Sequence, residues 1–168
     1  FSGSPIAMEP ETKYCQAILQ AWYPGQSGGK AAAEVLFGDY NPAGRLPVTF
    51  YRNITQLPDF EDYNMTGRTY RYFKGDPLFP FGYGLSYTTF NYGNIKLEQT
   101  IKVGETAKII VPVTNTGNRD GEEVVQVYLK KQEDAEGPVK TLRAFKRVQI
   151  PAGKTVNVEL ELTPKQLE

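Results

Sequence analysis

The sequence predicts an α/β segment followed by an all-β domain, and two patterns along the chain carry this prediction. A glycine-rich turn around Gly28 leads into a run of helix formers at 30–36, and residues 46–50 then have the composition of a strand. From residue 92 onward, short runs of alternating apolar and polar residues are separated by turn signals, which is typical of an antiparallel sandwich.

Three regions follow from these patterns. Residues 1–50 are predicted to be part of an α/β sheet domain, and residues 51–90, rich in aromatic residues, proline and glycine, an extended inter-domain segment. Residues 91–168 are predicted to be an antiparallel β-sandwich. This region shows about five strand patterns, whereas a sandwich of this kind has about seven. We therefore expect an incomplete sandwich and a chain less stable than a longer one.

The first region opens with a loop and a predicted helix. Residues 1–5 contain no signal-peptide pattern and are interpreted as a strand-to-helix connection, with a cleft-facing loop as the alternative. Glu9 and Glu11 lie near the helix start, where negative charge is favoured, and this role is preferred over a catalytic one. A helix is predicted over 11–22 because apolar residues recur there at helical spacing: Tyr14, Cys15, Ile18, Leu19 and Trp22.

The glycine-rich turn at 24–29 has only a superficial likeness to a phosphate-binding loop. Such a loop has four residues between its first glycine and Gly-Lys, and Ser or Thr follows the lysine. Here three residues intervene and Ala31 follows. Glycine is better explained by a close backbone approach, because it lacks Cβ. A packed turn is therefore predicted, with Gln26 or Ser27 lining a cleft as the alternative.

The segment after residue 50 is polar and has little periodicity. Its patch at 68–73 alternates arginine and aromatic residues and is predicted to be extended, with the tyrosines packed on one face. Such interleaving occurs on nucleic-acid-binding surfaces, but a neutral chain does not favour that partner. Asn53 and Asn64 each begin an Asn-X-Thr tripeptide, the glycosylation acceptor pattern, and their use as acceptors stays open.

Residues 77–90 are predicted to be irregular, because Pro77, Pro80, Gly82 and Gly84 exclude a regular helix. Aromatic side chains bury about 150–250 Å² each. A buried inter-domain clamp is therefore preferred over a sugar-stacking surface. Five aromatic residues in this segment supply the area: Phe79, Phe81, Tyr83, Tyr87 and Phe90.

The last region alternates with a period of two. The charged residues of its strands, such as Lys146 and Glu159, are predicted to form the solvated face. Strands are predicted at 95–101, 107–113, 123–129, 142–150 and 155–162.

Composition excludes several classes of protein. The chain has 168 residues with 19 basic and 19 acidic side chains, so its net charge argues against nucleic acid or an anionic membrane as the main partner. No apolar run reaches the roughly 18 residues of a membrane helix. There is no histidine, and therefore no histidine-based triad or metal site in this chain. The single cysteine, Cys15, cannot form an internal disulfide and is expected to be buried.

Three motifs resemble signatures of family 3 glycoside hydrolases. The first comprises AWYPGQSGGKA at 21–31 and VLFGDYNPAGRLPVTF at 35–50, and the second is PLFPFGYGLSYTTF at 77–90. The third, VTNTGNRDGEEVVQVY at 113–128, is similar to the fibronectin type III-like domain of that family. The resemblance covers nearly the whole chain in the order the family has.

The resemblance implies the C-terminal part of a β-glucosidase or β-xylosidase that releases terminal β-linked glucose or xylose, with residues 1–50 as the C-terminal portion of its α/β sheet domain. The nucleophile of that family is an aspartate before a tryptophan in an N-terminal barrel, whereas Trp22 follows Ala21 here. The acid/base carboxylate of the family lies in the middle domain, before the segment that begins here. No catalytic, cofactor-binding or metal-binding residue is therefore assigned, and the chain alone is expected to be inactive.

The resemblance also implies a periplasmic or extracellular location, with the oligosaccharide substrate bound through missing N-terminal domains. Nucleic acid and membrane are not expected as partners, and homo-oligomerisation stays open. A second class of function is a β-sandwich module that binds carbohydrate or protein. The strands carry few aromatic residues, chiefly Tyr128 and Phe145, which favours the enzyme part over the binding module.

Overall fold

The computed structural model describes residues 2–97 and 100–167. These residues form two compact units, which we describe separately. The first unit comprises the described residues up to Tyr40, together with Arg45–Tyr83 and Glu133–Val139. The second unit comprises Asn41–Gly44, the described residues of Gly84–Gln132, and those from Lys140 onward.

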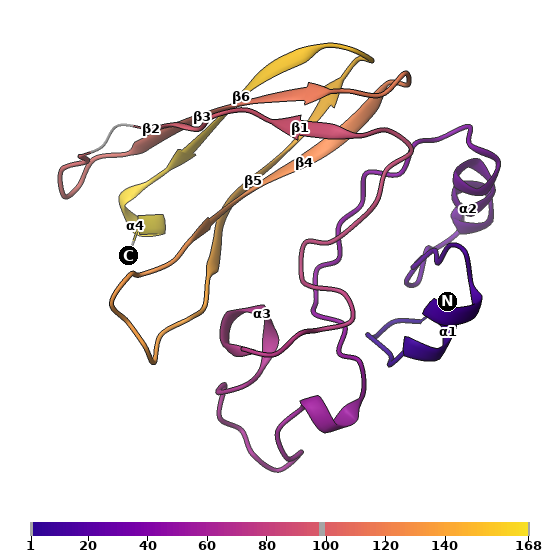
Figure 1. Ribbon diagram of the computed structural model, residues 1–168, viewed down its shortest axis with the longest axis horizontal. Coiled ribbons are helices and arrows are strands. Elements are labelled where there is room, and N and C mark those ends of the chain that lie inside the picture. The colour runs from indigo at the N-terminus through magenta and orange to yellow at the C-terminus, as the bar shows by residue number, and fades with distance from the viewer. Residues whose placement is uncertain (1, 98–99, 168) are drawn as a thin grey trace. The chain divides into compact units, whose positions relative to one another are not determined.

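The second unit consists mainly of antiparallel strands in two sheets (Figure 1). The larger sheet contains β1 (Phe90–Tyr92), β2 (Lys96–Leu97), β3 (Ala107–Asn115) and β6 (Thr155–Leu162). The smaller sheet pairs β4 (Gly121–Leu129) with β5 (Thr141–Ile150). A short helix, α4 (Pro164–Leu167), follows β6.

Strand β3 is the centre of the larger sheet. It pairs with β6 from Ala107↔Leu162 to Thr114↔Thr155. On its other edge it pairs with β1 through Phe90↔Asn115 and with β2 through Lys96↔Ile110. In β4 and β5 the register shifts at Val127/Tyr128, so an irregularity interrupts that ladder.

A core lies where the alternating apolar residues of the two sheets meet. Along β3 buried residues alternate with more exposed ones, as the period of two predicts. The main cluster draws on both sheets, which makes this unit a sandwich: Val111, Val113, Val125, Ile150, Val158 and Leu160. A smaller cluster combines Ala107, Ile109 and Leu162.

Most of the predicted strands are confirmed, and one is shorter than expected. The strand predicted over 95–101 is β2 alone, residues 100–101 have no strand conformation, and residues 98–99 lie outside the described part. The three-residue strand β1 has too few residues to show a period, and the sequence did not predict it. Lys146 and Glu159 are exposed, as expected.

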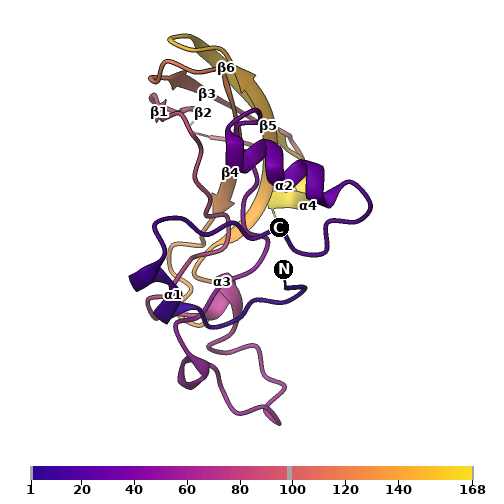
Figure 2. The ribbon, with the colours of Figure 1, turned by 90° about the vertical axis from the view of Figure 1, so that its right-hand side faces the viewer.

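The first unit contains short helices and irregular segments. Among its described residues the helices are α1 (Glu9–Tyr14), α2 (Gly28–Phe37), a 3₁₀ turn η1 (Ile54–Gln56) and α3 (Thr69–Tyr72). Figure 2 shows α2 side-on as the most regular of these. No helix in the described parts of the chain is long and apolar enough to cross a membrane.

Helix α2 confirms the helix predicted over 30–36. It ends at Gly38, whose φ of 83° is in the left-handed region that glycine adopts without strain, and whose N–H donates to the Val35 carbonyl. At its start, Gly28 is buried, and a Cβ there would lie 2.4 Å from Pro24 Cγ. The turn is therefore packed, and Gln26 and Ser27 are exposed beside it.

Two secondary-structure predictions for residues 1–50 are wrong, together with the predicted burial of Cys15. The helix predicted over 11–22 ends at Tyr14, whose side chain is 85% exposed, and Cys15, expected to be buried, is exposed as well. Helices in proteins are stabilised mainly by burying an apolar face, and here Tyr14, Ile18 and Leu19 stay exposed while Trp22 packs on Phe50. The strand predicted over 46–50 is reduced to one bridge, Phe50↔Phe79. The α/β sheet is therefore not confirmed.

A third prediction, an extended patch at 68–73, is also wrong, because α3 forms there. Its first residue, Thr69, has a φ of 55°, and the Thr69 N–H donates to the Tyr51 hydroxyl at 2.7 Å. A positive φ is rare for a β-branched residue, so the surrounding contacts determine this conformation. Alternation of arginine and tyrosine alone did not reveal it.

Aromatic contacts hold the centre of the first unit. Phe50 is 1% exposed and its ring centroid lies 6.1 Å from Trp22 and 6.5 Å from Phe79. Phe79 also stacks on Tyr83 at 5.3 Å. As predicted, residues 77–90 form no helix. Their role as an inter-domain clamp stays a prediction, as does the division of the chain at residues 50 and 90.

Candidate functional site

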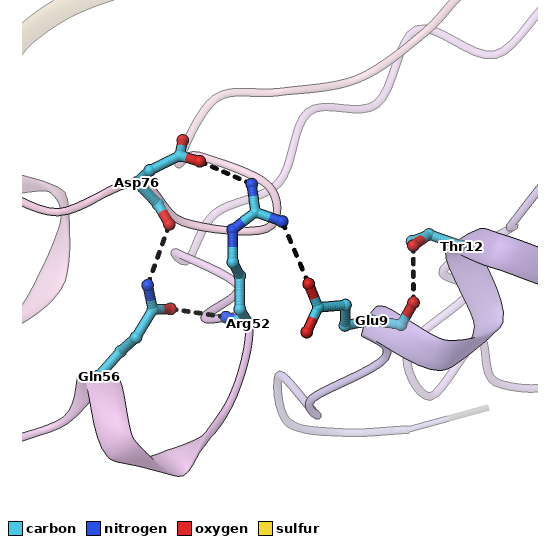
Figure 3. A network of polar contacts seen from close by, with 5 residues as sticks. All are labelled: Glu9, Thr12, Arg52, Gln56 and Asp76. Atoms are coloured by element: carbon cyan, nitrogen blue, oxygen red, sulfur yellow. Dashed lines mark hydrogen bonds and ion pairs between the residues drawn. The ribbon is translucent and has the colours of Figure 1, made fainter.

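The most connected polar cluster of the first unit is centred on Arg52 (Figure 3). Its guanidinium donates through Nη2 to Asp76 Oδ2 at 2.6 Å and through Nη1 to Glu9 Oε1 at 3.5 Å. The Arg52 backbone N–H donates to Gln56 Oε1 at 2.7 Å, and Gln56 Nε2 donates to the Asp76 carbonyl at 3.0 Å. Three segments that are far apart in the sequence are joined in this way.

Local structure positions each member of this cluster. Glu9 lies in the first turn of α1, where its carbonyl accepts a hydrogen bond from Thr12 Oγ1 at 2.7 Å. Gln56 ends η1, whose start is capped by Asn53, with Asn53 Oδ1 accepting from the Thr55 N–H at 3.0 Å. Asn53 therefore caps η1, and its use as a glycosylation acceptor stays open.

The charges of the cluster hold its three segments together. The hydrogen bond and charge of Asp76, followed by the charge of Glu9, raise the pKa of Arg52 above its ordinary value, so the guanidinium stays charged. Figure 3 shows the guanidinium between the two carboxylates. A retaining glycosidase instead needs two carboxyl groups roughly 5–5.5 Å apart across the substrate. The cluster can compensate charge and join segments, but its carboxylates do not converge on an open space.

A hollow of about 580 Å³ lies in the second unit between β5 and β6. Residues 143–146 and 159–161, together with Gln166, line it. Consecutive residues of each strand line the hollow, so it follows the strand edges that face away from β4 and β3. Gln166 Nε2 donates to the Arg143 carbonyl at 2.7 Å and Lys146 Nζ to the Glu159 carbonyl at 3.4 Å. Side chains thus occupy edge carbonyls, which is how proteins protect exposed strand edges.

One charged group at this hollow, Glu159, forms an ion pair on the surface. Lys108 Nζ lies 2.8 Å from Glu159 Oε2; this contact raises the pKa of Lys108 and lowers that of Glu159. Both side chains are more than half exposed, so solvent screens the interaction. A general acid needs a raised carboxyl pKa, and the pKa of Glu159 is shifted the other way. The direction of this shift therefore argues against a general-acid role for Glu159.

The two strand aromatics differ in exposure and in what covers them. Phe145 is 68% exposed on β5. Tyr128 is partly buried, with Lys140 Nζ 4.5 Å from its ring centroid and its hydroxyl donating to Gln126 Oε1 at 2.5 Å. Because Lys140 covers one face of Tyr128, a sugar ring cannot use that face. This arrangement weakens the binding-module alternative.

The other residues weighed from the sequence lie apart from these clusters. Residues 3–5 are exposed, and Gln20 Nε2 donates to the Ser2 carbonyl at 3.0 Å. Asn64 is exposed and donates through Nδ2 to Asp62 Oδ1 at 2.7 Å. Among the described residues, no group of three or more His, Cys, Asp or Glu side chains could hold a metal ion.

The Arg52 cluster was missed from the sequence. Glu9 was interpreted through its place at a helix start, which the structure confirms, but its pairing with Arg52 spans 43 residues. Such a pairing has no local pattern that would predict it. The only usable signal is the position of Arg52 and Asp76 on either side of the polar segment.

Comparison with known proteins identifies both parts of the chain. Residues 1–87 match the family model of the glycosyl hydrolase family 3 C-terminal domain. Residues 123–168 match that of the fibronectin type III-like domain. The order agrees with the resemblance found in the sequence motifs.

Individual relatives cover nearly all of the chain. It is 59% identical over 167 residues to a xylan 1,4-β-xylosidase of Xylanibacter ruminicola, with 99% of this chain and 19% of that protein covered. It is 40% identical over 177 residues to a periplasmic β-glucosidase of Salmonella typhimurium, with 96% and 23% covered. Among solved structures, β-glucosidase 3B of Thermotoga neapolitana has a TM-score of 0.88 at 34% identity, with 99% and 25% covered.

The chain thus spans about a fifth to a quarter of the length of these relatives. Because the match to the family model extends over residues 1–87 of 168, more than half of the sequence, the chain belongs to glycosyl hydrolase family 3.

Proposed function

We propose that this chain is the C-terminal, structural part of an exo-acting family 3 β-glycosidase that releases terminal β-linked xylose or glucose. The observation that carries the proposal is the 59% identity, over 99% of the chain, to a protein named xylan 1,4-β-xylosidase. That name makes a β-xyloside the first substrate to test. A relative named β-glucosidase at 40% identity keeps glucose as the second.

The chain itself supplies no catalytic carboxylate in this proposal. Its two best-placed acids, Glu9 and Asp76, share one guanidinium in the Arg52 cluster. Their role is to hold the segments of the first unit together. By keeping these segments ordered, the cluster helps to position a substrate site. Fixing the geometry of a substrate site can lower an activation barrier by several kcal/mol.

The finer features of the fold belong to the same proposal. Residues 1–50 complete an α/β sheet whose other strands come from residues outside this chain. That sheet covers the apolar residues after α1, among them Ile18 and Leu19, which are 41% and 45% exposed here. The location is periplasmic or extracellular, supported by the relative named a periplasmic β-glucosidase. The oligosaccharide binds chiefly through residues outside this chain.

The test is hydrolysis of aryl β-xyloside and aryl β-glucoside by two proteins. One is the 168-residue chain, and the other is the product of the full open reading frame that contains it. Turnover is expected from the longer protein and none from the chain. Turnover by the chain would show that it contains a catalytic site, and an inactive longer protein would contradict the glycosidase assignment.

A second experiment distinguishes a structural role of Glu9 and Asp76 from a catalytic one. In the longer protein, Glu9→Gln and Asp76→Asn are expected to change kcat by less than tenfold, because each carboxylate only pairs with Arg52. Loss of a general acid or base costs about 100-fold or more. Glu11→Gln is the matched control, since Glu11 occupies the same first turn of α1. A loss above 100-fold at Glu9 or Asp76 alone would make that residue catalytic.

A further inference from the structure

Five exposed apolar side chains, two of them aromatic and almost fully exposed, lie in residues 54–68, which we call the aromatic loop. Phe60 is 93% exposed and Tyr63 is 92% exposed, while Ile54 is 79% exposed. Met65 and Leu57 are also exposed, at 49% and 38%. Single exposed apolar residues are ordinary, but a group of them marks an interaction surface.

The aromatic loop is held in shape by its last residue, Arg68. Arg68 Nη2 donates to the Asp59 carbonyl at 2.9 Å and to the Asp62 carbonyl at 2.5 Å, and Nε donates to the Asn64 carbonyl at 3.1 Å. Two turns complete the frame: the Asp62 N–H donates to the Asp59 carbonyl at 3.1 Å and the Arg68 N–H to the Met65 carbonyl at 3.0 Å.

Glycine at position 67 permits the second of these turns. Gly67 has a φ of 73°, as the third residue of such a turn requires. The loop therefore presents Phe60 and Tyr63 from a preformed backbone. A preformed surface loses little conformational entropy when it binds.

The charges of the aromatic loop have one sign on its outer part. Residues 54–67 contain three acidic side chains, Asp59, Glu61 and Asp62, and no lysine or arginine. Arg68 is directed to the loop's own carbonyls. A partner that fits this surface therefore has an apolar centre and a basic rim.

We propose that the aromatic loop is a docking surface for another part of the same longer polypeptide, with Phe60 and Tyr63 as its central anchors. This inference rests on the proposed function, because relatives that contain 96–99% of this chain extend it four- to fivefold: it covers only 19–23% of their length. Aromatic side chains of this size commonly dominate an interface. The partner surface is a protein surface that is apolar at the centre and basic at the rim.

Two other occupants fit less well. A symmetric contact with a second copy would bring the acidic rim of one loop against that of the other, which is repulsive. A sugar ring stacks on flat aromatic faces, which Phe60 and Tyr63 offer but Ile54, Leu57 and Met65 do not, so a saccharide would leave the aliphatic part of the surface unused. Both are measured as outcomes of the test.

The test is hydroxyl-radical footprinting of Phe60 and Tyr63 in the 168-residue chain and in the full reading-frame product. We expect oxidation at both residues to be at least tenfold slower in the longer protein at a concentration where it is monomeric. Phe145, which is 68% exposed in the other unit, is the reference and is expected to react within twofold in both proteins. Equal rates at Phe60 and Tyr63 would overturn the proposal.

Two further conditions identify the occupant. Protection that appears only at concentrations where the longer protein self-associates would assign the surface to a second copy. Protection that appears only after xylohexaose or cellohexaose is added would assign it to saccharide. Either result would overturn the proposal. Because footprinting does not depend on turnover, an inactive longer protein with a protected loop would count against the glycosidase function alone.

A substitution arm checks the energetic role. In the longer protein, the double change Phe60→Ala and Tyr63→Ala is expected to lower the melting temperature by about 5 °C. The milder Phe60→Leu keeps an apolar side chain and is expected to lower it less. Phe145→Ala is the control and is expected to leave it nearly unchanged. A double variant with the same melting temperature as Phe145→Ala would contradict the role of Phe60 and Tyr63 as anchors.

Discussion

The two units of the chain place their apolar side chains differently. In the second unit, Val113 and Ile150 are fully buried between two sheets, at 0% exposure. In the first, Phe37, Phe60 and Tyr63 are more than 80% exposed, and Phe50 is the one large side chain below 2% among those described. Burial of apolar surface is the main stabilising contribution in a folded domain. The two units must therefore depend on different kinds of contact.

Outside its aromatic centre around Phe50, the first unit is ordered largely by turns and polar contacts. Arg52 joins three segments, Arg68 closes the aromatic loop, and Gly38 ends α2. The second unit combines its core with a buried polar residue, Asn115, which links its strands and turns. Substitutions in the second unit are therefore expected to cost more, and each prediction below compares a position with a matched control.

The largest effect is expected at Asn115. Its side chain is 0% exposed and uses all four of its hydrogen-bonding positions. Oδ1 accepts from Thr88 Oγ1 at 2.6 Å and from the Gly117 N–H at 3.1 Å. Nδ2 donates to the carbonyls of Arg119 at 2.8 Å and Ile150 at 2.9 Å. Asn115→Leu would leave all four groups without this partner and is expected to cost about 3 kcal/mol of unfolding free energy.

Urea unfolding followed by far-UV circular dichroism measures this loss. Asn157→Leu is the control, because Asn157 is exposed on β6, and it is expected to stay within about 0.5 kcal/mol of the parent chain. Trp22, the single tryptophan, lies in the first unit, and its fluorescence transition is expected to move less. Equal losses at Asn115 and Asn157 would contradict the role of Asn115.

Smaller changes in stability, of opposite sign, are expected when Gly38, which caps α2, and Gly29, inside α2, are each replaced by alanine. Gly38→Ala places a Cβ at a φ of 83° and is expected to cost about 1–2 kcal/mol. Gly29→Ala lies inside the same helix, where a Cβ would meet no atom within 4 Å, and is expected to stabilise by about 0.5–1 kcal/mol. Trp22 fluorescence in urea measures both. Shifts of the same sign would show that α2 is not limited by its backbone conformation.

The same contrast explains what the sequence predicted. Strands β3 to β6 were predicted because each alternating run has its cover in a neighbouring strand of the same chain. The helix over 11–22 and the strand over 46–50 were predicted from equally regular patterns. In the helix region Tyr14, Ile18 and Leu19 stay exposed, while Trp22 packs on Phe50. The strand pairs only in part, through the Phe50↔Phe79 bridge and the backbone hydrogen bonds between Leu46 and residues 82–83. A local sequence pattern identifies the apolar face of an element. Whether other residues bury that face is decided by the tertiary structure.

Polar clusters follow a different rule. Helix α2 was predicted because its signals, the glycine-rich turn and the run of helix formers at 30–36, lie within a few residues of each other. The Arg52 cluster and the four partners of Asn115 were not, because their members are separated by up to 43 residues. The sequence contains many possible hydrogen-bond or ion-pair partners for a charged or amide side chain, and only the fold determines which few of them lie close enough. The resemblance of 113–128 to a known motif marked the segment around Asn115 without giving its hydrogen bonds.

The smallest effect is expected in the aromatic loop, at low pH. Hydrogen bonds from the Asn64 backbone N–H, at 2.9 Å, and from its side chain lower the pKa of Asp62 below the usual aspartate value. A carboxylate with a lowered pKa stabilises the folded loop above the unfolded pKa, about 3.9, and this contribution is lost as the pH falls through the lower, folded pKa. The Asn64 amide signal in NMR spectra is therefore expected to titrate with a midpoint below 3.9. Asp62→Asn should abolish this titration, whereas Glu61→Gln, next to it in the loop, should leave it unchanged. A midpoint at or above 3.9 would show that Asn64 does not hold the Asp62 carboxylate, and the loop would then depend on Arg68 and its two backbone turns.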